Sequence, residues 1–236
     1  MDTNTRISDA VARWPLIVFD WDGTLMDSEA RIVQSMHAGI MEAGMPPRSD
    51  AQIRGIIGLG LCEAVRALFP EASEAELRRV CEAYRAHYFA NETPSPLFPG
   101  AAEMLAALRE AGHLLAVATG KSRRGLDEAL EQTGLGPLFA VTRTADETRS
   151  KPHPRMLEEI VRALDLPPQA GLMVGDSAYD ILMAHAAGMD ALAVGWGVQP
   201  AEALLEHDPA GLVEDMHEIP RWLARAGTER RTREPR

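Results

Sequence analysis

The stretch LIVFDWDGT, residues 16–24, joins an apolar segment to a pair of acids. Leu16–Phe19 are apolar without alternation, which is typical of a strand buried on both faces of a parallel sheet. Asp20 and Asp22 follow directly, and Gly23 allows the chain to turn sharply. Ligands of open α/β sheets bind beyond the carboxyl ends of the strands. We therefore expect this stretch to form a central strand and part of a binding site.

Similar apolar runs recur along the chain, with helical patterns between them. The further runs are Leu114–Ala118, Leu172–Val174, Ala191–Val194 and, more weakly, Leu138–Val141. Apolar residues recur at helical spacing in Met104–Ala111, Leu126–Thr133 and Met156–Leu164. Strand and helix thus alternate from Pro99 onward, which favours an α/β fold with a doubly wound parallel sheet.

The region between Ser28 and Pro96 interrupts this alternation, because it has no strand-like run. Ile32–Met41 and Leu77–Tyr88 each carry apolar residues at helical spacing, and closely spaced prolines then mark the return to the alternating part. This pattern predicts a helical insertion. The predicted division is a core of residues 14–27 and 97–226, an insertion of residues 28–96, and flexible tails at 1–13 and 227–236.

The composition narrows the classes of function. The net charge of −11 argues against general nucleic-acid binding, which needs a basic surface. No stretch approaches the roughly 20 apolar residues of a membrane span, and the N-terminus lacks the apolar run of a signal peptide. Cys62 and Cys81 lack the spacing of a zinc site. We expect a cytoplasmic protein without nucleic-acid or membrane partners, either a monomer or a homodimer.

A second acidic motif, Gly175–Asp180, also follows an apolar strand run. If the two strands are neighbours, Asp176 lies beside Asp20 and Asp22, and three carboxylates converge. Close acids repel one another unless a cation or a proton intervenes, and Mg²⁺ binds carboxylates together with phosphate oxygens. The simpler alternatives are a solvated Asp-Gly turn at the first motif and helix N-capping by Asp176 or Ser177 at the second.

Two further segments offer groups that bind phosphate. Thr119–Ser122 ends a strand run and precedes a helix, so its backbone N–H groups and hydroxyls can hold an anion. It is not a P-loop, because Leu115 stands where that motif needs its first glycine, and N-capping of the helix is the alternative. Lys151, placed beside Pro152 and Pro154, offers a positive charge for a phosphate. The alternative for Lys151 is an ordinary solvated surface lysine.

Together these motifs resemble those of the haloacid dehalogenase superfamily, in its phosphatase branch. Four motifs match in order: Asp20–Thr24, Thr119–Gly120, Lys151–Pro152, and Gly175–Asp176 with Asp180. The resemblance implies a Rossmann-like core, with the insertion of residues 28–96 as a small α-helical cap. Within the superfamily the chain looks most like phosphoglycolate phosphatases and related sugar-phosphate phosphatases.

The resemblance also implies the catalytic and metal-binding roles. Asp20 corresponds to a nucleophile that forms an aspartyl-phosphate, which is known chemistry for a carboxylate. Asp22 corresponds to the general acid/base that protonates the leaving alkoxide and then activates water. Asp20, Asp176 and the backbone carbonyl of Asp22 correspond to the ligands of a Mg²⁺ ion.

The remaining matched residues correspond to the phosphate site. Thr119 and the Gly120 N–H match the phosphate binders, Lys151 the residue that steadies nucleophile and phosphate, and Asp180 an acid that orients Lys151. The expected activity is Mg²⁺-dependent hydrolysis of a small phosphate monoester such as phosphoglycolate or a sugar phosphate. The expected partner is therefore a small phosphorylated metabolite.

Three alternatives stay open. A dehalogenase of this fold is disfavoured because such enzymes lack the acid at the position of Asp22. A phosphosugar mutase needs a cap that recognises a bisphosphate, and Arg54, near Gly58–Gly60, is a candidate substrate contact unless it is an exposed helix arginine. The third is a non-catalytic phosphate-binding regulatory protein, which has no need for acids at Asp20, Asp22 and Asp176 together.

Overall fold

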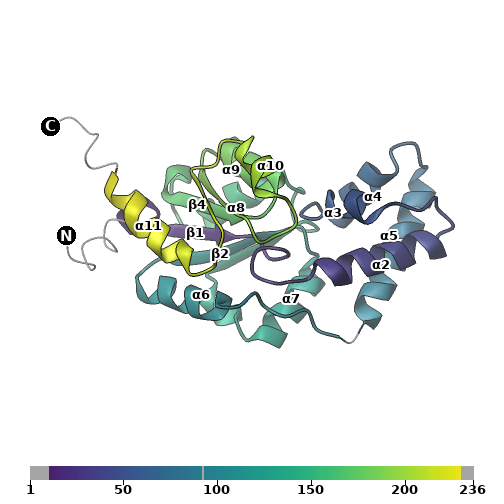
Figure 1. The fold of residues 1–236 in the computed structure, drawn as a ribbon, viewed down its shortest axis with the longest axis horizontal. Coiled ribbons are helices and arrows are strands. Elements are labelled where there is room, and N and C mark those ends of the chain that lie inside the picture. Colours follow the sequence, from purple (N-terminus) through teal and green to yellow (C-terminus); the bar gives the residue numbers. More distant parts are fainter. Residues whose placement is uncertain (1–10, 92, 230–236) are drawn as a thin grey trace.

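The computed structural model describes residues 11–91 and 93–229 and contains a parallel sheet with helices on both faces (Figure 1). Its strands are β1 (Leu16–Phe19), β2 (Leu114–Thr119), β3 (Val141–Thr144), β4 (Gly171–Gly175), β5 (Asp190–Val194) and β6 (Gly211–Val213). Within the described residues the strand order is β3-β2-β1-β4-β5-β6, and all neighbouring pairs are parallel. This is the doubly wound Rossmann order, so the predicted fold class is confirmed.

The central strands are buried on both of their faces. In β1, Ile17 and Phe19 belong to one apolar cluster, whereas Leu16 and Val18 belong to the other. The first cluster includes helices α6 (Ala101–Glu110), α7 (Arg123–Thr133) and α11 (Glu218–Glu229). The second includes α8 (Arg155–Ala163), α9 (Ala178–Ala187) and α10 (Ala201–Leu205). Because helices cover both faces, β1 has no polar alternation, which explains its sequence.

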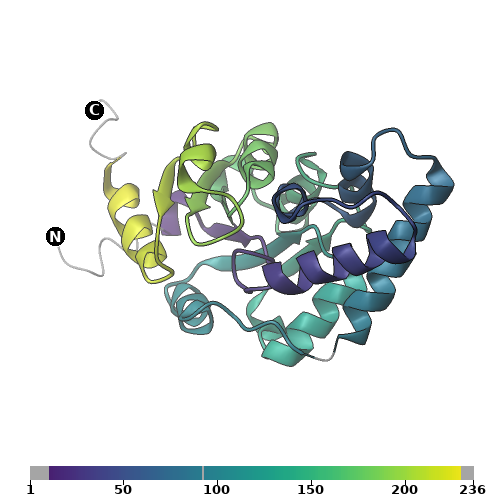
Figure 2. The ribbon, with the colours of Figure 1, turned by 45° about the vertical axis from the view of Figure 1, so that its right-hand side comes forward.

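The helical insertion forms a layer of its own beside the carboxyl ends of the strands (Figures 1 and 2). Its helices are α2 (Glu29–Glu42), α3 (Asp50–Arg54), α4 (Leu61–Leu68) and α5 (Glu74–Ala90). Apolar side chains from all four pack into a separate cluster. The sequence pattern predicts α2 and α5, which pack along each other. It does not predict α3 and α4, which are short and flank the Gly58–Gly60 loop.

One predicted strand is displaced in the structure. The weak apolar run Leu138–Val141 is not a strand over most of its length, because a 3₁₀ helix covers Gly136–Leu138 and β3 begins only at Val141. Phe139, in the loop, packs against the first apolar cluster instead. The strand β3 lies at the edge of the sheet and is half-buried over its first three residues, so polar side chains can occupy it. The apolar run therefore marks a loop anchor and not the strand.

Both predicted tails overlap helical segments of the structure. Residues 11–13 are helical, and Arg13 Nη1 donates a hydrogen bond to the carbonyl oxygen of Ala226 at 2.7 Å. Helix α11 continues past the predicted boundary at 226, to Glu229, and Gly227 is buried. The remaining parts of both predicted tails lie outside the described residues. Among the described helices, none has both the length and the apolar content needed to cross a membrane.

Candidate active site

The strand order brings the predicted site residues to one edge of the sheet. β1 lies between β2 and β4; Asp20 follows β1, Asp176 follows β4, and Thr119 ends β2. Between β1 and β4 the winding of the sheet reverses, which is where open α/β sheets form a ligand crevice. Strand ends that are far apart in the sequence therefore meet around Asp20.

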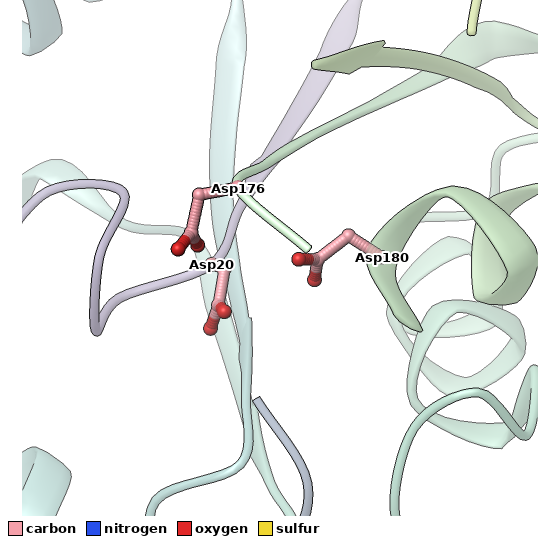
Figure 3. Close-up of side chains that lie close together, drawn as sticks. All are labelled: Asp20, Asp176 and Asp180. Carbon is pink, nitrogen blue, oxygen red and sulfur yellow. The ribbon is translucent and has the colours of Figure 1, made fainter. Parts of the chain in front are cut away.

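Three buried acids form a cluster at this edge. Asp20, Asp176 and Asp180 are each 1% exposed, and one oxygen from each lies within 4.8 Å of the others (Figure 3). Burial raises the pKa of Asp20 well above its usual value, against the lowering effect of Lys151. Burial and the neighbouring Asp180 raise the pKa of Asp176 to about 7. Burial is the main cause of both shifts, and repulsion between the neighbouring acids adds to it.

Lys151 is the ammonium within this acid cluster. Its Nζ lies 2.8 Å from Asp20 Oδ1 and 2.6 Å from Asp180 Oδ1, and its side chain is fully buried. Burial alone would lower the pKa of Lys151, but Asp180 and Asp20 outweigh burial and raise it, so the group stays charged. Asp180 also accepts hydrogen bonds from the backbone N–H and hydroxyl of Ser177, at 3.2 and 2.7 Å. Asp180 is thereby held in place beside Lys151.

The donor set of the cluster suits a hard divalent cation. Three carboxylates face a single ammonium, and carboxylate oxygens are the ligands such cations prefer. Asp176 is positioned by Thr24 Oγ1, which donates to its Oδ1 at 2.8 Å, and by the Val198 N–H, which donates to its Oδ2 at 2.8 Å. The third acid of the cluster is Asp180. The carboxylate of Asp22 is not part of it and contacts Lys121 and Ser28 instead. Any part of Asp22 in cation binding therefore falls to its backbone carbonyl.

The Asp22 carboxylate lies in a second polar group beside the acid cluster. It accepts a hydrogen bond from Ser28 Oγ at 2.5 Å, and Lys121 Nζ lies 2.8 and 3.1 Å from its two oxygens. The same Nζ lies 2.9 Å from the hydroxyl of Tyr88, on helix α5. Burial works to lower the pKa of Lys121, but Asp22 and Tyr88 raise it, so Lys121 is an ammonium. Asp22 is thus held by Ser28, at the start of the cap, and by Lys121 of the core, which in turn contacts Tyr88 of the cap.

Sequence reasoning missed Lys121 as a site residue. Its signal was present, because it directly follows Thr119 and Gly120 in the segment identified as a phosphate seat. What the sequence does not show is that the strand end turns this side chain back toward Asp22, where it is 9% exposed.

The segment after β2 divides its roles between two hydroxyls. Ser122 caps helix α7 by accepting a hydrogen bond from the Gly125 N–H at 3.2 Å. Thr119 is fully buried, and its Oγ1 accepts from the Lys121 N–H at 3.2 Å. A Cβ on Gly120 would lie 2.5 Å from the carbonyl oxygen of Leu59, so only glycine permits this close approach of the cap loop. Because Ser122 meets the capping need, Thr119 remains available as a phosphate contact.

A cavity of about 220 Å³ lies between these strand ends and the cap. Asp20, Asp22, Thr119 and Gly120 are among the residues that line it. Arg54 is not among them; it is exposed on α3 and forms an ion pair with Glu29 at 2.5 Å. The geometry therefore favours the exposed-arginine alternative for this residue.

Comparisons with known proteins identify the family of this chain. Residues 17–194 match the family described as haloacid dehalogenase-like hydrolase. The Dickeya dadantii protein named Probable phosphatase IndB is 34% identical, over 87% of this chain and 91% of that protein. A phosphoglycolate phosphatase of Agrobacterium fabrum is 33% identical, over 85% of this chain and 88% of the relative.

Solved structures give the same answer for the fold. The crystal structure of a protein described as a predicted phosphoglycolate phosphatase, from Haemophilus somnus, superposes with a TM-score of 0.80. Its sequence is 26% identical, and the match covers 89% of this chain and 98% of the other. The family match takes in the acid cluster, Lys151 and the whole cap. The chain belongs to the haloacid dehalogenase-like hydrolases and is related to their phosphatases.

Proposed function

We propose that this protein is a Mg²⁺-dependent phosphatase that hydrolyses a small phosphate monoester through an aspartyl-phosphate on Asp20. The observation that carries the proposal is the state of the two Asp20 oxygens. Oδ1 is held by Lys151 at 2.8 Å and by the Trp21 N–H at 2.6 Å, whereas Oδ2 is buried without a hydrogen-bond partner. A fixed carboxylate with one unengaged oxygen, in a residue that lines the cavity, suits nucleophilic attack.

The residues divide the reaction between them. Asp20 attacks the phosphorus atom, the ester P–O bond breaks, and Asp22 gives its proton to the departing alkoxide. Water then attacks the phosphorus of the aspartyl-phosphate, Asp22 takes a proton from that water, and the bond to Asp20 breaks to release phosphate. Asp22 can serve in both steps because Ser28 and Lys121 hold its carboxylate in one position.

The phosphate is bound by groups at the same strand ends. Thr119 and the Gly120 N–H would contact its oxygens, and Lys151 would offset its charge while it steadies Asp20. A Mg²⁺ ion held by Asp20, Asp176 and the Asp22 carbonyl would supply further positive charge to the phosphoryl group. Positioning and charge neutralisation are what phosphoryl transfer mainly requires.

The decisive assay is phosphate release from p-nitrophenyl phosphate, followed by a panel with phosphoglycolate, hexose and pentose phosphates. We expect release that stops with EDTA and returns with Mg²⁺. Rapid quenching should trap a phosphoryl group on the peptide that contains Asp20. Folded protein that binds phosphate esters but releases no phosphate from any of them would favour a non-catalytic binding role. Transfer of phosphate between sugar positions, without net release, would favour a mutase.

A further inference from the structure

The cavity has two chemically different sides, and the inference below rests on the proposed function. We call the side formed by Asp20, Asp22, Thr119 and Lys121 the core side. The cap side is formed by apolar and aromatic residues that include Ile32, Met36, Ile56, Leu59, Tyr84 and Phe89. The core side suits the phosphate, so the cap side meets the organic part of the substrate.

The only basic side chains among the described residues that line the cavity are Lys121 and Arg85. The ammonium of Lys121 has three N–H donors. It has three acceptors in place, the two Asp22 oxygens at 2.8 and 3.1 Å and the Tyr88 hydroxyl at 2.9 Å. Lys121 therefore has no donor left for a second anionic group on the substrate.

The charges farther from the phosphate are unfavourable to an anion. Arg85 contributes one positive charge but lies exposed on α5, where water competes for it. Glu63 and Asp146, which are exposed as Arg85 is, contribute two negative charges to the same lining, so these three screened charges sum to a net negative charge. A carboxylate or second phosphate on the substrate would thus exchange its water shell for apolar walls and a net negative lining, which is costly. An uncharged apolar group gains from the same walls.

The cavity volume limits the size of that group. At about 220 Å³, the cavity lies below the roughly 300–1,000 Å³ of pockets that hold drug-sized ligands. A phosphate group takes part of this space. The remainder fits a short branched alkyl chain or a small ring.

We infer that the substrate is the phosphate monoester of a small, uncharged, largely apolar alcohol. This departs from phosphoglycolate, whose carboxylate would face the cap side, and from the bisphosphate that a mutase requires. The cap side then selects against a second negative charge on the substrate and favours apolar surface.

A matched pair of esters tests the inference. Isobutyl phosphate and phosphoglycolate carry the same number of non-hydrogen atoms beyond the ester oxygen, but only phosphoglycolate carries a carboxylate. With Mg²⁺ and the full chain, kcat/KM for isobutyl phosphate should be higher by about tenfold or more. Equal values, or a preference for phosphoglycolate, would overturn the inference and leave the phosphatase activity standing. No hydrolysis of either ester or of p-nitrophenyl phosphate would overturn the proposed function itself.

Two sets of variants locate the selectivity on the cap side. Glu63→Gln should raise the ratio of kcat/KM for phosphoglycolate over isobutyl phosphate by about two- to fivefold. Glu71→Gln, at an exposed acid outside the cavity lining, is the matched control and should leave the ratio unchanged. Ile56→Thr and Ile56→Val introduce side chains of the same shape, of which only threonine is polar. The ratio of kcat/KM for phosphoglycolate over isobutyl phosphate should therefore be higher in Ile56→Thr than in Ile56→Val. If neither Glu63→Gln nor the Ile56 pair changes this ratio as stated, the assignment of substrate selectivity to the cap side is overturned.

Discussion

The core side and the cap side of the cavity are built on opposite principles. On the core side, buried charges are joined by short contacts: Lys121 Nζ lies 2.8 Å from Asp22 Oδ1, and behind the cavity lining Lys151 Nζ lies 2.8 Å from Asp20 Oδ1. On the cap side, the lining is mostly apolar, and the cap meets the core through polar contacts such as Tyr88 to Lys121. A second such contact is the Gly60 N–H, which donates to Ser150 Oγ at 2.7 Å.

This difference suggests that the core side carries out the reaction and the cap side selects the substrate. A buried network of charges costs desolvation, so its retention at the strand ends is best explained by what it does there. Apolar walls need no such network, and their shape and charge decide which organic group fits. Variants of the core side should therefore change rate and stability together, whereas variants on the cap should change selectivity or very little.

The largest effect should come from Asp20→Asn. The amide keeps the shape of the side chain but is a poor nucleophile, so kcat should fall by about 10⁴-fold or more. Circular dichroism should show an unchanged fold, because the substitution also relieves the repulsion among the three acids. Asp27→Asn, an exposed acid nearby, serves as the control and should stay active. Substantial turnover by the Asp20 variant would refute its role as the nucleophile.

Lys151→Met tests whether one side chain supports both rate and stability. Without the ammonium, Asp20 and Asp180 are buried without their charge partner. We expect the free energy of unfolding to fall by about 3–5 kcal/mol in urea denaturation, and phosphate release to be lost. Adding Asp180→Asn should recover part of the stability, because one uncompensated acid is removed.

A matched control for Lys151 is Arg155→Met, which breaks a pair with Glu159 in which the arginine is 44% exposed. Its effect on unfolding should be small, because exposed pairs contribute little. If Lys151→Met and Arg155→Met lower the free energy of unfolding equally, the buried ion pairs contribute no more than the exposed one, contrary to the prediction.

Lys121→Met should separate proton transfer from binding. With Asp22 no longer held by Lys121 Nζ, kcat for an alkyl phosphate should fall by about 10²-fold. p-Nitrophenyl phosphate should lose less, because its leaving group departs without a proton. Tyr88→Phe, which removes only the hydroxyl contact at 2.9 Å, should give a smaller loss in the same order. A uniform loss across both esters would point to a structural role for Lys121.

The sequence predicts that the strand-end residues of the core side lie together, because the signals for them are local. Each motif directly follows an apolar strand run, and parallel strands bring their carboxyl ends to one edge, so Asp20, Thr119 and Asp176 could be placed together. Lys121 was missed because its partner Asp22 comes from another strand end and Tyr88 from the cap. No spacing rule joins residues 88 and 121.

The cap side was harder to predict for a physical reason. Its short helices α3 and α4 contain five and eight residues, too few to show a clear period. Which of their side chains face the cavity depends on how the cap packs on the core. Arg54 appeared well placed near the Gly58–Gly60 loop, but the fold turns it toward Glu29.

The buried position of Asp176 predicts that cation binding depends on pH. Its pKa is raised to about 7 from the usual 3.8, so a proton competes with the cation below that pH. Apparent Mg²⁺ affinity in calorimetry should rise about tenfold between pH 6 and pH 8. In EDTA, the stability that the bound proton contributes is complete below about pH 3.8 and is lost as pH rises through about 7. An affinity independent of pH would place the cation away from Asp176.

The smallest effect should come from Arg54→Ala, on the outer surface of the cap. Arg54 is exposed, pairs with Glu29, and is not part of the cavity lining, so kcat/KM for any ester should change by less than about twofold. Glu29→Ala removes the other half of the same ion pair and should behave alike. A selective loss of one substrate in Arg54→Ala, without the same loss in Glu29→Ala, would mean that the cap rearranges to bring Arg54 to the substrate. The cap side would then include a cation, and its preference for uncharged esters would have to be redrawn.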